Sequence, residues 1–187
     1  MASLIVATDQ IMDDTQELND IVAGCRKGDN NAFSQLLSLY SKRCYGYFYR
    51  LTGNAELSND LLSKLFLRLV QKISSFKGGS FEKWLFTIAS NIFHDHLRHQ
   101  YRQKRLIEAK TEEMIHETPQ SAAETEMLDK LQSQLSKLDA DTAELITMRF
   151  YGQLSFKELS ELRGEPIGTT LSKVHRGIRK LREYMGG

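Results

Sequence analysis

Residues 154–182 read LSFKELSELRGEPIGTTLSKVHRGIRKLR, and this stretch decides the fold of the C-terminal part of the chain. Ser155 is placed to cap a short helix, and Glu158, three residues on, completes a capping box. Pro166 disfavours helical geometry in the residue before it, so this helix should end near Arg163. Apolar residues at steps of three and four then predict a second, longer helix after the turn. The stretch is typical of a helix-turn-helix.

The second helix of this stretch has two different faces. Its apolar stripe consists of Leu171, Val174, Ile178, Leu181 and Met185. The other sides carry hydroxyls, amines and guanidiniums, which are the groups that read base edges and hold phosphates in a DNA groove. A solvated, basic surface helix is the alternative interpretation. Taken alone, the stretch therefore leaves DNA recognition open.

The same helical rhythm runs through most of the chain. It predicts helices over residues 17–26, about 33–51, about 58–73 and from 81 into the nineties, and again from residue 128 onward. The apolar faces are wide and the connections short, so the first four helices should pack as one bundle. No alternating strand pattern occurs. We predict an all-α fold.

Periodicity fades from about Leu106 to Ala123, where threonine, serine and proline stand among acids. This composition is typical of a linker between domains. We therefore expect a loose extension over residues 1–13, a helical domain over 14–105, an acidic linker over 106–123, and a second helical domain over 124–187.

Charge is unevenly distributed, although the net charge is only +1. Four bases face one acid between Asp95 and Arg105, six acids face one lysine from Glu108 to Glu126, and five bases stand without an acid from Leu171 to Arg182. Two basic patches separated by an acidic segment fit two nucleic-acid contacts joined by a tether that does not bind.

Several other classes of protein are disfavoured. Cys25 and Cys44 have no metal-ligand spacing and form no disulfide framework, as expected of reduced cysteines. The histidines at 94, 96 and 99 form no clean pair at helical spacing, and no acid or cysteine completes a metal site. There is no phosphate loop or nucleophile elbow, so we expect neither an enzyme nor a cofactor. No apolar run is long enough for a membrane span and no leader is apparent, so we expect a cytoplasmic protein without membrane insertion.

Five further motifs occur in order along the chain. They are Gly28-Asp29-x-x-Ala32-Phe33; Asp60-Leu61-Leu62 with Phe66-Leu67-Arg68-Leu69; Phe81-x-x-Trp84-Leu85-x-x-Ile88-Ala89-x-Asn91 with Asp95 and Arg98; Leu135-x-x-Leu138; and Pro166-x-Gly168-Thr169 with Ser172, His175 and Arg176. In this order they resemble a sigma-70 family RNA polymerase sigma factor of the small extracytoplasmic-function type. The resemblance covers residues 17–185 and implies that the first domain is sigma region 2 and the second is region 4.

The resemblance implies three binding surfaces. Core polymerase would be bound by Asp60, Leu61, Leu65, Phe66 and Arg68. The −10 promoter element would be read and melted by Lys77, Trp84, Asn91, Asp95, Arg98, Arg102 and Arg105. The −35 element would be read by Thr169, Thr170, Leu171, Ser172, Lys173, His175, Arg176 and Arg179. The residue types fit, because melting needs aromatic groups beside unstacked bases and cations on the phosphates. Trp84 is nevertheless also a natural core residue of the bundle.

Two pairs of adjacent residues depart from the family pattern. Ser63-Lys64 stands where Gln-Glu is common, so either the partner surface is compensated or the position lies at the rim of the interface. Thr170-Leu171 stands where Val and a basic residue are usual. Leu171 either joins the buried stripe or touches a thymine methyl group.

The expected partners are core RNA polymerase, promoter DNA and, as the resemblance implies, an anti-sigma factor, with no small-molecule substrate. The alternative function is a stand-alone helix-turn-helix regulator in which the N-terminal bundle serves for dimerisation or sensing.

Overall fold

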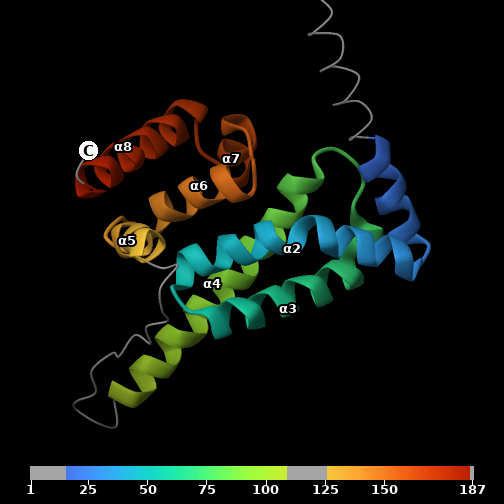
Figure 1. The fold of residues 1–187 in the computed structure, drawn as a ribbon, viewed down its shortest axis with the longest axis horizontal. Coiled ribbons are helices and arrows are strands. Elements are labelled where there is room, and N and C mark those ends of the chain that lie inside the picture. The colour runs from blue at the N-terminus through green and yellow to red at the C-terminus, as the bar shows by residue number, and fades with distance from the viewer. Residues whose placement is uncertain (1–15, 109–125, 186–187) are drawn as a thin grey trace, which may run out of the picture.

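The fold is known from a computed structural model that describes residues 16–108 and 126–185 (Figure 1). The expected N-terminal extension over residues 1–13 lies outside the described residues. So does nearly all of the expected linker over 106–123.

The described chain forms two helical domains. The first contains a helix over residues 16–26, α2 (Asn30–Thr52), α3 (Ala55–Lys72), the short 3₁₀ helix η1 (Ile73–Ser75) and α4 (Phe81–Glu108). The second contains α5 (Glu126–Leu135), α6 (Ala140–Tyr151), α7 (Phe156–Arg163) and α8 (Ile167–Met185). The described ranges contain no strand. The predicted all-α fold with two helical domains is confirmed.

Local capping explains where the helices begin and end. The capping box of Ser155 and Glu158 is present, and Gly164 ends α7 with a left-handed φ of 64°. α3 begins three residues before its predicted start, because the Asn54 side chain accepts a hydrogen bond from the backbone N–H of Leu57 at 2.9 Å. α4 runs to Glu108, slightly past the predicted end of the first domain.

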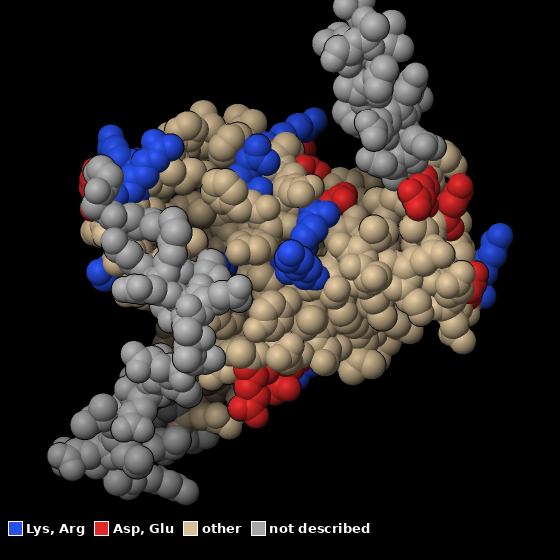
Figure 2. Space-filling model, in the orientation of Figure 1, with Lys and Arg blue, Asp and Glu red and all other residues tan. Residues whose placement is uncertain are grey.

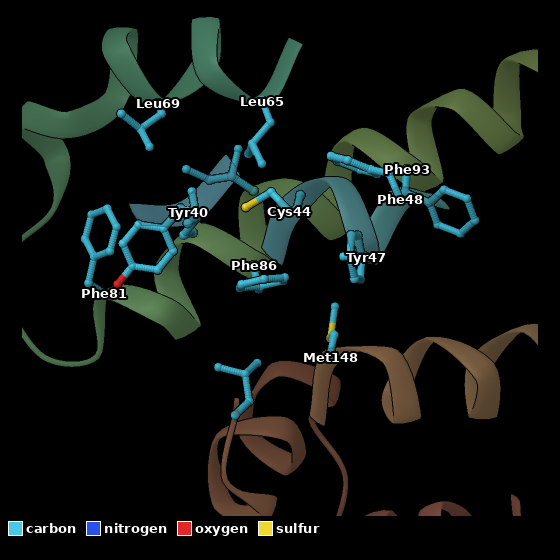
Figure 3. Close-up of a cluster of buried hydrophobic side chains, with 14 of the residues drawn as sticks. Tyr40, Cys44, Tyr47, Phe48, Leu65, Leu69, Phe81, Phe86, Phe93 and Met148 are labelled. Atoms are coloured by element: carbon cyan, nitrogen blue, oxygen red, sulfur yellow. The ribbon is translucent and has the colours of Figure 1, made fainter. Parts of the chain in front are cut away.

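The core of the first domain lies between α2, α3 and α4 (Figure 3). The side chains that fill it include Tyr40, Cys44, Tyr47, Phe48, Leu65, Leu69, Phe81, Phe86 and Phe93. Cys25 and Cys44 are both free and buried, and burial raises the pKa of the Cys44 thiol to about 12. Met148 of α6 points toward Tyr47 and Phe86 from the other domain, so the two domains share an apolar contact.

The two domains meet along a continuous boundary, which we call the domain seam, with α2 and α4 on one side and α5, α6 and α7 on the other. Glu144 of α6 lies at its centre and is 1% exposed. Its carboxylate accepts hydrogen bonds from the hydroxyls of Tyr47 and Ser90, each at 2.7 Å. It also contacts His94 Nε2 at 2.9 Å and Arg163 Nη2 at 2.7 Å. A buried charge is tolerated only when it is paired in this way.

None of the described helices has the combination of length and apolar character needed to cross a membrane.

Packing between α6 and α8 requires a glycine at position 177. A Cβ at Gly177 would lie 2.5 Å from Cγ2 of Thr142 and 2.7 Å from Cδ1 of Ile146. We expect Gly177→Ala to lower the free energy of unfolding by about 2 kcal/mol, because overpacking outweighs the gain in helix propensity. Chemical denaturation measures this. Gly168→Ala is the matched control in the same helix, because a Cβ there meets nothing within 4 Å. Equal stability of the two variants would contradict the close contact.

Stability should depend on pH through Glu144. Burial alone would raise the pKa of this carboxyl, but the charge of Arg163 and the hydrogen bonds from Arg163, Tyr47 and Ser90 outweigh burial and hold it below its usual value. A lowered folded-state pKa stabilises the fold above the unfolded pKa, about 4.3, and this contribution is lost as pH falls through the folded pKa. We expect Glu144→Gln to cost roughly 3 kcal/mol at pH 7, and progressively less as the pH falls below the unfolded pKa. Thermal unfolding of both proteins between pH 7 and pH 3 measures this difference. Parallel curves would show that the carboxylate is not charged in the fold.

Candidate nucleic-acid interface

The exposed face of α8 is the first candidate surface. Thr169, Ser172, His175 and Arg176 line a shallow hollow together with Gly168, at the N-terminal half of the helix. Arg179 is also exposed, one turn further on. Figure 2 shows Lys and Arg side chains gathered over this helix. Hydroxyls and guanidiniums at the start of a helix that follows a tight turn suit the edges of bases in a major groove.

Two residues expected on this face have other roles in the structure. Thr170 is fully buried, and its hydroxyl donates to Glu165 Oε1 at 2.7 Å. Lys173 donates to Asp141 at 2.7 Å and to Glu165 at 2.6 Å, and these hydrogen bonds raise its pKa. Both side chains therefore hold α8 against α6 and the turn and do not point into a groove. Periodicity could not reveal these bonds, because they join α8 to the turn before it and to Asp141 of α6.

The sequence left two roles open for Leu171, a place in the buried stripe or a contact with a thymine methyl group. It is 40% exposed, so it does not join the buried stripe, whereas Val174 of that stripe is fully buried. The helix is rotated so that Thr170 takes the inward position. An exposed leucine beside Ser172 is free for apolar contact.

The N-terminal half of α4 and the loop before it form the second candidate surface. Lys77 is exposed next to Gly78 and Gly79, whose φ angles are +98° and +88°. Both glycines face open space, which permits close approach of a ligand to the backbone. Trp84 is half-buried, with ring centroids 5.4 Å from Phe76 and 5.6 Å from Phe81. Its indole thus belongs to an aromatic cluster and still has an exposed part.

The C-terminal half of α4 extends past the bundle (Figure 1). Asp95, Arg98, Arg102 and Arg105 are all exposed on it, as is Asn91 one turn before Asp95. Asp95 and Arg98 form an ion pair with each other, one turn apart. Because Arg98 is paired with Asp95, Arg102 and Arg105 are more accessible than Arg98 to a phosphate.

The outer face of α3 is the third candidate surface. Asp60 and Arg68 are exposed, whereas Leu61 and Leu65 are completely buried in the core. The expectation that these two leucines contact a partner directly is not compatible with this fold. Phe66 is half-buried. The exposed apolar side chains on this face are instead Leu67 at 64% and Val70 at 49%. The exposure of these two side chains could have been predicted from the sequence, because both lie off the Leu61–Leu65–Leu69 stripe.

The three histidines of α4 do not converge. His94 contacts Glu144, and His96 lines a small pocket between α3 and α4 with His99, Lys64 and Arg68. Burial, followed by the charges of Lys64 and His99, lowers the pKa of His96. Within the described residues, no group of three or more metal-ligating side chains could hold a metal ion.

Comparison with known protein families matches both domains. Residues 36–103 match the model "Sigma-70 region 2", and residues 128–181 match "Sigma-70, region 4". The sigma factor CarQ of Myxococcus xanthus is 33% identical over 166 residues, covering 86% of this chain and 93% of CarQ. The extracytoplasmic-function sigma factor SigW of Bacillus subtilis is 27% identical over 172 residues, covering 86% of this chain and 92% of SigW.

Solved structures agree with these matches. The sigma factor RpoE of Bartonella quintana, in complex with the anti-sigma factor NepR, superposes with a TM-score of 0.68 at 25% identity, covering 82% of this chain and 96% of RpoE. CnrH, solved with the cytosolic domain of CnrY, has a TM-score of 0.66 at 19% identity, covering 88% of this chain and 94% of CnrH, and supports the fold alone. The chain belongs to the sigma-70 family of RNA polymerase sigma factors, in its extracytoplasmic-function group.

Proposed function

We propose that the protein is a dissociable subunit of RNA polymerase that directs initiation at specific promoters through −10 and −35 elements. The observation that carries this is the exposed face of α8, which joins hydroxyls and cations on the helix-turn-helix of a sigma region 4 domain. We assign residues 14–105 to region 2, 106–123 to the linker and 124–187 to region 4. Sigma factors are not a class of enzymes, and we propose that this chain catalyses no reaction itself and works in the cytoplasm with the polymerase.

For the −35 element, we assign groove contacts to Thr169, Leu171, Ser172, His175, Arg176 and Arg179. Arg176 is the strongest candidate for a base contact, since it is exposed and lines the same hollow as Thr169 and Ser172. Leu171 is suited to a thymine methyl group. Thr170 and Lys173 we assign instead to positioning the helix.

For the −10 element, we assign base contact to Trp84 and Asn91 and phosphate contact to Lys77, Arg98, Arg102 and Arg105. A partly exposed indole offers a stacking surface to an unpaired base, and the flexible glycines beside Lys77 suit a base turned out of the duplex. Asp95, paired with Arg98, would orient that guanidinium.

For core polymerase, we assign the outer face of α3. Asp60 and Arg68 supply charges, and Leu67 and Val70 supply apolar area that no other described residue covers. An apolar centre with charges around it is the usual anatomy of a protein interface. We further propose that an anti-sigma factor regulates the chain, as the solved complex of RpoE with NepR suggests.

Reconstitution tests the function. The purified protein is added to core polymerase and a mixed promoter library, and run-off transcripts are sequenced. Specific transcripts that share two elements support the proposal. A protein that never co-elutes with core polymerase, but binds duplex operators by itself, would instead be a stand-alone regulator.

We expect Arg176→Ala to reduce transcription from −35-dependent promoters about tenfold, because one base-contacting arginine contributes about 1–3 kcal/mol. Binding to core polymerase should be unchanged in a pull-down. Lys42→Ala removes the same charge from an exposed position on α2 and is the control. Equal loss of transcription and core binding would show that Arg176 is structural.

We expect Leu67→Ser to weaken binding to core polymerase about tenfold, because a leucine buried at an interface contributes about 1.5–3 kcal/mol. Fluorescence anisotropy of labelled protein measures the dissociation constant. Leu39, 54% exposed on α2, provides the matched variant Leu39→Ser, which should bind as the wild type does. Equal weakening of binding in both variants would contradict the assignment of the outer face of α3 to core polymerase.

A further inference from the structure

A pocket of about 380 Å³ lies between α3 and α4, and residues of region 2 alone line it. Its volume is within the usual range of small-molecule sites in proteins. The lining residues are Leu61, Lys64 and Arg68 of α3, and Ile92, Asp95, His96 and His99 of α4. Four of these side chains carry basic nitrogens and only Asp95 carries a carboxylate. The pocket therefore has the composition of a site for an anion.

The two cations that α3 contributes to the pocket are not neutralised by the protein. Lys64 and Arg68 are one helical turn apart and both are exposed. Among the described residues, neither forms an ion pair. Asp95 lines the same pocket but pairs with Arg98, which does not line it. Because Asp95 is compensated in this way, the pocket keeps a net positive charge that an anion can satisfy.

His96 adds a buried polar atom to the wall of the pocket. Its Nε2 atom is shielded from solvent and has no hydrogen-bond partner among the described residues. Burial, followed by the charges of Lys64 and His99, lowers the pKa of the imidazole, which is therefore neutral near pH 7. A buried nitrogen without a partner is unfavourable. An anion in the pocket would accept a hydrogen bond from Nε2 and would offset the neighbouring positive charges.

Lys64 is also a feature of the sequence that the surfaces assigned above do not use. It belongs to the pair Ser63-Lys64, which departs from the family pattern. A glutamate at position 64 would lie one turn from Arg68, would partly cancel its charge and would repel an anion. A lysine at this position instead doubles the positive charge that α3 brings to the pocket.

The chemistry of the lining favours a terminal phosphate group. A guanidinium binds phosphate through parallel hydrogen bonds, and an ammonium adds a point charge. The charges of Arg68 and Lys64 together match the roughly two negative charges of a phosphate monoester at pH 7. Leu61 and Ile92 form an apolar part of the wall, which suits an organic group attached to the phosphate. A phosphodiester in a polynucleotide has one charge and sugars on both sides, so it matches the pocket less well.

We propose that the pocket between α3 and α4 binds a phosphorylated small molecule of the nucleotide class, held by Lys64, Arg68, His96 and His99. A nucleotide combines terminal phosphates with a planar group that can lie against the apolar wall. The inference goes beyond promoter-directed initiation and does not depend on it. Arg68 also lies on the face proposed for core polymerase, so the ligand and the polymerase would share this residue.

Isothermal titration calorimetry of the free protein, without magnesium, tests the site. The probes are ADP and inorganic pyrophosphate, and adenosine is the phosphate-free counterpart of ADP. Both probes should bind and adenosine should not. Lys64→Glu should weaken ADP binding at least about tenfold, because a charge-assisted hydrogen bond is lost and a repulsive charge is added.

Lys72→Glu is the matched control for this substitution. It makes the same change of charge at an exposed position of α3 that does not line the pocket. This variant should bind ADP as the wild type does. Failure of both probes to bind the folded wild type, or equal affinity of Lys64→Glu and wild type for ADP, would overturn the proposal. Failure of the reconstitution with core polymerase would contradict the proposed function and leave these titrations unaffected.

Competition experiments identify the source of the anion. Citrate carries its negative charges on carboxylates, and a single-stranded DNA oligonucleotide without a terminal phosphate carries only phosphodiesters. Both should displace ADP far less effectively than pyrophosphate does. Equal displacement by citrate would overturn the assignment to phosphate. Equal displacement by the oligonucleotide would overturn the assignment to a small molecule and make the pocket part of the −10 surface.

The pH dependence of ADP binding tests the two histidines. A bound anion favours protonated His96 and His99, whereas Asp95, Lys64 and Arg68 keep their charges between about pH 8 and pH 6. Since the pKa of His96 is lowered in the free protein, binding should take up protons and become tighter as the pH falls. The double variant His96→Gln with His99→Gln cannot take up these protons and should lack the tightening. An identical pH dependence in both proteins would overturn the proposed role of the histidines.

Discussion

Among the ionised groups described at the domain seam, the buried carboxylate of Glu144 has the most partners in both domains. Its carboxylate is 1% exposed and bridges α6 to Arg163 within region 4 and to Tyr47, Ser90 and His94 in region 2. Removing a charge of this kind from water is costly, and only the full set of partners compensates for it. Each partner must therefore be in place at once, which fixes both the rotation and the register of α6 against α2 and α4. The apolar contact of Met148 and the close approach of Tyr151 to Gly46 follow from that register.

α4 has three differently placed sets of side chains: one in the core, one against region 4 and one exposed to solvent. Phe81, Phe86 and Phe93 fill the core, Lys83, Ser90 and His94 meet region 4, and Asn91 and the arginines after it face solvent. From Phe86 and Phe93 to the region 4 set, and from that set to the solvent-facing one, the step around the axis is roughly a fifth of a turn, as the helical period of 3.6 residues gives. A residue's function therefore depends on its phase around the axis more than on its place in a motif. The same reasoning separates Leu67 from Leu65 on α3, since neighbouring apolar residues there face solvent and core respectively.

Much of this fold could be predicted from the sequence, because the features that decide it are local. The capping box at Ser155, the glycine stop at Gly164 and the apolar rhythm of α2 act over a few residues and are present as expected. What could not be predicted depends on contacts that helical periodicity does not reveal. Thr170 and Lys173 were expected to contact the groove, but they bond to Glu165 in the turn before α8 and, for Lys173, to Asp141 of α6. The packing of the Tyr151 ring against Gly46 could not be predicted either, since nothing near Gly46 in the sequence indicates that ring.

The chemistry of the domain seam bears on whether it can open. A boundary between domains made mainly of apolar side chains would expose that surface to water on separation, at a cost that grows with area. Here a large share of the contacts are hydrogen bonds and ion pairs of Arg43, Lys83 and Glu144. On separation each of these groups regains water, so the net cost per contact is far smaller than the contact's own strength. A partner that offers equivalent anions or donors can then replace one side of the seam at little net expense.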